Sequence, residues 1–150
     1  RNIVTGKFLG SFFVATIALL PTLIYIVSIQ QLAVGSGLDF GATIGAYIGL
    51  FFLAAVFSAI GICASSFTNN AVVAFIISLI ACALLYYGFN AISKLPFLSG
   101  GLDYYIEMAG IDFHYSSISK GVVDTRDIIY FTSVLLLMLF ITERNLSKKI

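Results

Sequence analysis

The sequence predicts an all-α protein, a polytopic membrane helical bundle with four transmembrane helices. Hydrophobic residues make up 60% of the 150 residues and charged residues only 10%, whereas about a quarter of a soluble domain is charged. The mean hydropathy is +1.06. The apolar residues are gathered in four long runs, each long enough as a helix to cross a hydrocarbon core of about 30 Å.

The predicted spans follow one another with short polar connections. They cover residues 8–29, 41–65, 71–89 and 126–143, and residues 90–125 form the one long segment that is not membrane-spanning by composition. Pro21 interrupts the first span, and because proline lacks a backbone donor we expect a kink there. Tyr86 and Tyr87 close the third span, and tyrosines are typical of the lipid headgroup boundary.

The second span carries small residues on one face. Gly41, Gly45 and Gly49 are four residues apart and therefore lie above one another on a helix. Since the hydrophobic effect does not drive helices together in lipid, transmembrane helices associate largely through the close backbone packing that small residues allow. The pattern predicts a protein neighbour packed against these three glycines.

Short interfacial helices are predicted within residues 90–125, because apolar residues there follow a helical spacing. Asp124 is a candidate N-cap for the last span, and Asp127 lies in its first turn, where the positive end of the helix dipole favours an acid. The residues with helical spacing are Leu102, Tyr105, Ile106 and Ala109 in one group, and Ser119, Val122 and Val123 in the other.

The charges at the ends of the chain predict its orientation. With four spans both termini lie on the same side, and that side carries five basic residues against the single acid Glu143: Arg1, Lys7, Arg144, Lys148 and Lys149. Basic residues accumulate on the cytoplasmic side of membrane proteins. We therefore expect both ends of this chain to be cytoplasmic.

The apolar parts of the spans, with the last counted from 128 to 142, contain no ionisable residue. Ion-coupled carriers, voltage sensors and intramembrane proteases need such groups at membrane depth. The sequence also has no GxxxxGK[ST] phosphate loop, no HExxH and no GxSxG. We expect no enzyme activity, and no catalytic, cofactor-binding or metal-binding residue, in this chain. A net charge of +1 gives no indication of nucleic-acid binding.

Three polar residues in and before the start of the last span are ionisable: His114, Arg126 and Asp127. His114 is the only histidine, and a lone histidine in a surface segment is usually a polar surface residue rather than a metal ligand. For Arg126 and Asp127 the simplest interpretation is a helix cap with solvated charges.

Three stretches resemble the permeases of ABC-2 type transporters, and in particular the permease of the gliding-motility ABC transporter. The first is GKFLGSFFVA at 6–15, and the second runs from DFGATIGAYIGL through SSFTNN to AFIISL at 39–79. The most specific is HYSSISKGVVDTRDIIYFTSV at 114–134, which is similar to the segment that leads into the last span of that group.

This resemblance implies that residues 1–150 are a single ABC-2 type transmembrane domain, the later part of a six-helix permease and incomplete at its N-terminus. Its expected location is the bacterial inner membrane. Its implied partners are membrane lipid, a second permease copy or paralogue, and a separate ATPase that binds ATP and Mg²⁺. Residues 90–125 would be an external segment that partly dips into the membrane.

The resemblance also assigns residues to places in the complex. Arg1, Asn2 and Lys7 would lie nearest the ATPase, and His114, Arg126 and Asp127 would lie at the external mouth of the pathway. The alternative function is a membrane scaffold or anchor of a motility complex that moves no solute. A channel is disfavoured, because the spans lack charged rings and a carbonyl-filter sequence.

Overall fold

The computed structural model describes residues 2–33, 35, 37–98 and 100–148, and its regular secondary structure in these ranges is helical. The elements in chain order are α1 (Asn2–Leu19), α2 (Thr22–Leu32), α3 (Phe40–Phe67), α4 (Ala71–Ala83), the π-helical turn η1 (Leu84–Gly88), α5 (Phe89–Ser93), the 3₁₀ turn η2 (Pro96–Leu98), α6 (Leu102–Met108), α7 (Ile111–Ser119) and α8 (Thr125–Ser147). The prediction of an all-helical chain is confirmed over these residues.

Four helical stretches of the described residues are long and apolar enough to cross a membrane. They are Ile3–Leu32, Phe40–Phe67, Ala71–Ser93 and Thr125–Ser147. Each corresponds to one predicted span, and each extends beyond the predicted boundary at one end or both. Each extension is one to five residues long, because helices continue for a short distance beyond the unbroken apolar runs that mark the predicted spans.

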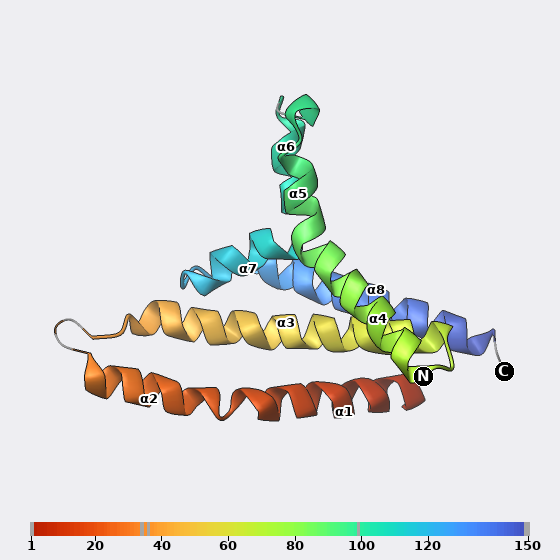
Figure 1. Cartoon of the computed structure of the whole chain (residues 1–150), viewed down its shortest axis with the longest axis horizontal. Helices are drawn as coiled ribbons and strands as arrows, with labels where there is room; N and C mark the ends of the chain where they lie inside the picture. Colours follow the sequence, from red (N-terminus) through yellow and green to blue (C-terminus); the bar gives the residue numbers. More distant parts are fainter. Residues whose placement is uncertain (1, 34, 36, 99, 149–150) are drawn as a thin grey trace.

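α3 is the helix against which the other long elements pack. It contacts α1, α4, α7 and α8, and in Figure 1 it runs between the layer formed by α1 and α2 and the layer formed by α7 and α8. The core forms where α3, α7 and α8 meet, from Val56, Ile60, Ile111, Ile118 and Phe131. The second predicted span is therefore the central helix of the bundle.

The first span is broken at Pro21, as the sequence predicts. α1 ends at Leu19, and α2 begins at Thr22 with Pro21 as its N-cap residue. Proline cannot donate the backbone hydrogen bond that would continue α1. α2 consequently runs in a direction of its own, and no residue of α2 is buried.

The third span ends in an irregular helix that leaves the bundle. α4 continues through the π turn η1 into α5, which reaches Ser93 rather than the predicted residue 89. Figure 1 shows α5 and α6 standing away from the other helices. The amide Nδ2 of Asn90 on α5 donates to Glu107 Oε1 at 3.4 Å and to Asp112 Oδ2 at 3.3 Å, and these bonds join α5 to the segment that follows it.

The segment 90–125 contains short helices, as predicted. Of these, α7 packs along the first half of α3 (Figure 1). The helical spacing assigned to residues 119–123 is wrong, because α7 ends at Ser119 and residues 120–124 form a turn and an extended link. The positive φ of Gly121, +87°, is the backbone conformation that ends this helix.

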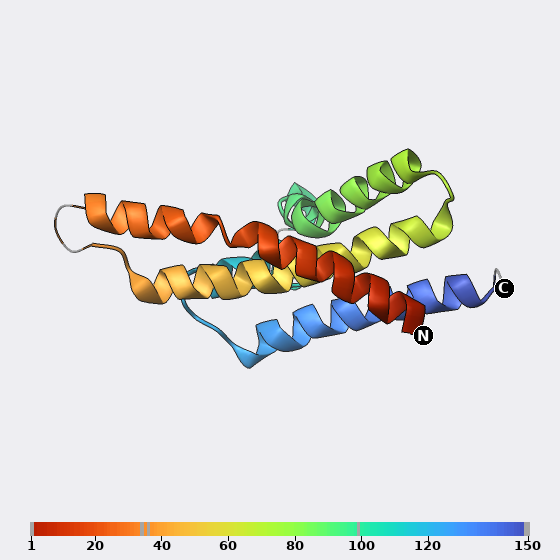
Figure 2. The same cartoon turned by 90° about the horizontal axis from the view of Figure 1, so that it is seen from below.

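α8 returns along α3 to the end of the molecule where α1 begins. Figures 1 and 2 place the first residues of α1, the last turns of α8 and the connection between α3 and α4 at this same end. There Asn145 Nδ2 donates to the carbonyl oxygen of Ser66 at 2.9 Å and to its Oγ at 3.0 Å. These two bonds join the ends of α8 and α3.

Candidate functional site: a buried histidine–aspartate pair

The site begins with the face that α7 turns toward the core. Ile111, His114 and Ile118 are all buried on this helix. Residues three and four apart lie on one face of an α-helix, so the histidine falls between the two isoleucines and is carried inward with them. Only 3% of His114 is exposed.

The first turn of α8 supplies the partner of this histidine. Asp124 is the N-cap as predicted, and its Oδ1 accepts a hydrogen bond from the backbone N–H of Arg126 at 3.2 Å. Asp127 follows one turn later and is 4% exposed. The cap fixes where α8 begins, and it thereby directs Asp127 toward α7.

The two side chains form a short contact. His114 Nδ1 lies 2.6 Å from Asp127 Oδ1, and His114 Nε2 donates to the carbonyl oxygen of Met108 at 2.9 Å. Both ring nitrogens therefore face oxygen atoms, and since the carbonyl of Met108 can only accept, Nε2 carries a hydrogen and one further proton is shared between Nδ1 and the Asp127 carboxyl group. The contact joins α7 to α8 across the non-helical residues 120–124.

Tyr130 completes the surroundings of the histidine. Its ring stacks on the imidazole with centroids 4.0 Å apart and an angle of 21° between the planes, and stacking of two rings adds to the stability gained by burying them. The Tyr130 hydroxyl donates to the carbonyl oxygen of Ala109 at 2.7 Å, so the ring is fixed at both ends. The imidazole is thus held by a carboxylate, a carbonyl and a ring.

A cavity of about 390 Å³ opens beside the pair. It brings together His114, Arg126 and Asp127, the three residues that the resemblance assigns to one place, and adds Lys120, Ser116 and Ser117. Asp127 Oδ2 is buried and has no hydrogen-bond partner among the described residues. A buried carboxylate oxygen without a donor is costly, and this one belongs to a residue that lines the cavity.

The interpretation of two of these residues from the sequence is wrong. His114 is not a surface residue, because the apolar face of α7 buries it. Asp127 is not a solvated helix charge, because it is covered by the contact with α7. Arg126 is exposed, in agreement with the interpretation of its charge as solvated. One member of this buried pair, Asp127, therefore lies one residue before the apolar run 128–142.

The three glycines of α3 lie against the same part of the structure. A Cβ on Gly45 would collide with the carbonyl oxygen of Ile118 and would lie 2.7 Å from Gly121 Cα. A Cβ on Gly49 would lie 3.1 Å from the Tyr115 ring, and one on Gly121 would lie 3.1 Å from the carbonyl oxygen of Gly41. The neighbour of the glycine face is α7 and its C-terminal turn, rather than another spanning helix.

Two of the three residues assigned to an ATPase contact lie on α1, whose start is at the same end of the molecule as the last turns of α8 (Figures 1 and 2). Arg1 is outside the described residues, Asn2 begins α1, and Lys7 is exposed on α1. Arg144 and Lys148 follow in the last turns of α8. Within residues 2–33, 35, 37–98 and 100–148, no group of three or more His, Cys, Asp or Glu side chains could hold a metal ion.

Sequence reasoning missed Lys120, Tyr130 and the Met108 carbonyl. One signal could have located the pair: His114 is three residues after Ile111 and four before Ile118, which places it on an apolar helix face. The carbonyl of Met108 has no sequence signal, because its role depends on the turn between α6 and α7. Tyr130 is three residues after Asp127 on the same helix face.

Comparisons of the chain with protein-family models, with curated protein sequences and with solved structures gave no match.

Proposed function

We propose that this chain is a transmembrane subunit of an ABC-2 type transporter complex, driven by a separate ATPase, with a link to gliding motility. The proposal rests on the resemblance of residues 6–15, 39–79 and 114–134, set on four helices that are long and apolar enough to cross a membrane. The main support is that residues 114–134, the segment with the most specific resemblance, include the buried contact between α7 and α8 and also pack against α3.

In this proposal the end that holds both termini faces the cytoplasm. Lys7 lies in the first half of α1, and Arg144 and Lys148 lie in the last turn and at the C-cap of α8. The start of α1 and the end of α8 are at this end of the molecule (Figures 1 and 2), as the positive-inside rule favours. The ATPase would dock here, close to the start of α1. The inner bacterial membrane is the location that fits such a complex.

A second permease, either another copy or a paralogue, would face the helices that this chain leaves uncovered. No residue of α2 or α4 is buried within the chain, so lipid or another membrane protein must cover them. Closure of the ATPase on nucleotide would shift the equilibrium between inward-open and outward-open arrangements of the two permeases. ATP and Mg²⁺ would be bound by the ATPase alone.

The test is purification of the full-length protein from its native membrane in a gentle detergent, followed by mass spectrometry of the proteins that accompany it. A stoichiometric soluble ATPase with a phosphate loop is the expected result, and the same measurement identifies the second permease. If the membrane subunits stay together but no ATPase is present, the transporter proposal is wrong and the alternative, a membrane scaffold of a motility complex, takes its place.

A second measurement separates transport from anchoring when the ATPase is found. A transporter predicts that ATP hydrolysis by the purified complex rises when its substrate is added, because substrate binds one of the alternating states better than the other. A scaffold predicts a rate that no added lipid, polysaccharide or peptide changes.

A further inference from the structure

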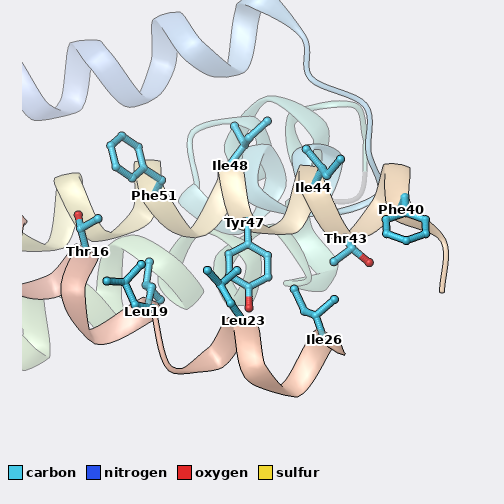
Figure 3. A pocket seen from close by; sticks show the side chains of 11 residues that line it. Thr16, Leu19, Leu23, Ile26, Phe40, Thr43, Ile44, Tyr47, Ile48 and Phe51 are labelled. Atoms are coloured by element: carbon cyan, nitrogen blue, oxygen red, sulfur yellow. The ribbon is translucent and has the colours of Figure 1, made fainter. Parts of the chain in front are cut away.

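We propose that an apolar groove between α2 and α3 binds one acyl chain of a membrane lipid. The groove has a volume of about 510 Å³. Figure 3 shows its walls: Leu19, Leu23 and Ile26 extend from α1 and α2 toward α3, whereas Ile44 and Phe51 belong to α3. This site is separate from the charged cavity beside His114, and it does not depend on the transporter proposal.

The break at Pro21 explains why the groove exists. α1 packs against α3. α2 begins after the break, at Thr22, and none of its residues is buried. The Tyr47 hydroxyl lies 2.7 Å from Thr22 Oγ1. The tyrosine side chain therefore bridges α3 and α2 and separates the two helices. In Figure 3 this ring reaches from α3 toward α2.

The hydroxyl groups that line the groove are occupied by partners within the chain. Thr16 and Thr43 each donate to the backbone carbonyl four residues earlier, at 2.9 and 2.8 Å, and Tyr47 is paired with Thr22. None of the described residues that line the groove is charged. The walls therefore favour an apolar occupant, since a polar one would lose its hydrogen bonds to water on entering.

The length of the groove matches one leaflet of a bilayer. Phe40 and Phe51, at the two ends of its α3 wall, are eleven residues apart along one helix, which is about 16.5 Å at ~1.5 Å per residue. Half of a hydrocarbon core of about 30 Å is ~15 Å. Phe40 adjoins Asp39 in the polar link that precedes α3, so the lipid headgroup would lie at this end.

The volume of the groove distinguishes a lipid tail from a protein helix. A methylene group is about as large as a water molecule, which takes up ~30 Å³. A groove of about 510 Å³ therefore has room for roughly 17 methylene groups, the size of one acyl chain. A helix of the same length and ~10–12 Å across occupies about 1300–1900 Å³. A helix would have to lie outside the groove, whereas one acyl chain fits within it.

Residues 1–150 contain no tryptophan, so a tryptophan introduced there reports on the groove through the difference in fluorescence between the variant and the unsubstituted protein. Phe51→Trp places the probe at its inner end, and Phe75→Trp is the matched control, since Phe75 lies on α4 with 65% of its surface exposed. The full-length protein, with any partners that accompany it, is reconstituted in vesicles of phosphatidylcholine with brominated acyl chains, which quench tryptophan on contact. Both variants should be quenched in the vesicles.

The discriminating step is extraction into detergent followed by washing. Lipid on an open helix surface exchanges with detergent, so Phe75→Trp should recover its fluorescence, whereas Phe51→Trp should stay quenched by the lipid held in the groove. Equal recovery in both variants would overturn the proposal. So would a Phe51→Trp signal that is unquenched in the vesicles themselves, because that result means another protein covers the groove.

A variant that fills the groove tests its location. Leu23→Phe with Thr43→Phe adds two rings to the space between α2 and α3, and with Phe51→Trp added it should lose the quenching that survives extraction. Elution of the variant at the unchanged volume in size-exclusion chromatography shows that it is folded. Quenching that survives in this filled variant would contradict the assignment of the lipid to this groove.

Discussion

His114 Nδ1 and Asp127 Oδ1 lie 2.6 Å apart where α7 meets α8, and both side chains are almost completely buried. This contact joins a short helix to a spanning helix across residues 120–124, which have no helical structure. Because α7 also packs on the glycines of α3, the pair links α7, α8 and α3 into one unit.

Removal of the histidine should therefore destabilise the protein strongly. His114→Ala leaves the Asp127 carboxyl group buried without its partner, and removing one member of a buried pair of ionisable groups costs about 3–5 kcal/mol. The measurement is the free energy of unfolding of the purified protein in detergent, or its thermal midpoint.

The double variant His114→Phe with Asp127→Leu is the control for this loss. It replaces both ionisable groups by apolar ones, a change that is often nearly neutral for stability in a buried pair, and phenylalanine can keep the stacking on Tyr130. The double variant should be clearly more stable than His114→Ala. Equal losses would show that the ion pair is not what holds α7 to α8.

Alanine substitutions at two glycines of α3, Gly45 and Gly61, should differ in their effect on stability. Gly45→Ala introduces a Cβ that collides with the Ile118 carbonyl, and overpacking of this kind costs about 1–3 kcal/mol. Gly61→Ala on the same helix meets nothing within 4 Å, so the better helix propensity of alanine should leave stability unchanged or raise it by up to ~1 kcal/mol.

Thermal midpoints of the two single variants, measured side by side in one detergent, check this prediction. A larger pair of side chains, Gly45→Leu with Gly49→Leu, should prevent assembly and lower the yield of folded protein. A normal yield of that double variant would mean that α7 does not pack on α3.

Asn145 should contribute modestly to stability, since its two hydrogen bonds to Ser66 join uncharged groups. Asn145→Ala is expected to lower the free energy of unfolding by about 1 kcal/mol. Ser78→Ala is the matched control, because the Ser78 hydroxyl bonds only locally, to the carbonyl of Phe75 on its own helix at 2.8 Å. If both variants unfold at the same temperature, the bond between α8 and α3 carries no stability.

The proposed orientation can be tested with cysteines on opposite ends of the molecule. Lys120 adjoins Gly121, which packs on the start of α3, whereas Lys148 follows the end of α8, and both are exposed. In a background that lacks Cys63 and Cys82, a membrane-impermeant maleimide added to spheroplasts should label Lys120→Cys and leave Lys148→Cys unlabelled until the membrane is permeabilised. The reverse pattern would invert the orientation.

The spans could be predicted from sequence because hydropathy is a local property. Each apolar run became a helix, Pro21 broke the first one, and Asp124 and Asn70 became N-caps through hydrogen bonds to the first backbone amides of α8 and α4. Each of these features depends on neighbours within a few residues along the chain.

The site could be predicted only in part, because it depends on distant contacts. The resemblance grouped His114, Arg126 and Asp127, and one cavity does contain all three. The burial of His114 and Asp127 was missed, since it arises from α7 packing into the glycine face of α3, about seventy residues earlier in the sequence than His114. A run of small residues indicates that something packs there, but it does not identify the neighbour.

The π turn Leu84–Gly88 has a consequence for the tolerated length of the chain. A π turn holds one residue more than an α turn, so the residues after it are rotated by about 100° relative to an uninterrupted α-helix. Deletion of a single residue here would restore regular winding and turn Asn90 away from Glu107 and Asp112. Between Ala71 and Ser93 the number of residues is thus constrained as closely as their chemistry.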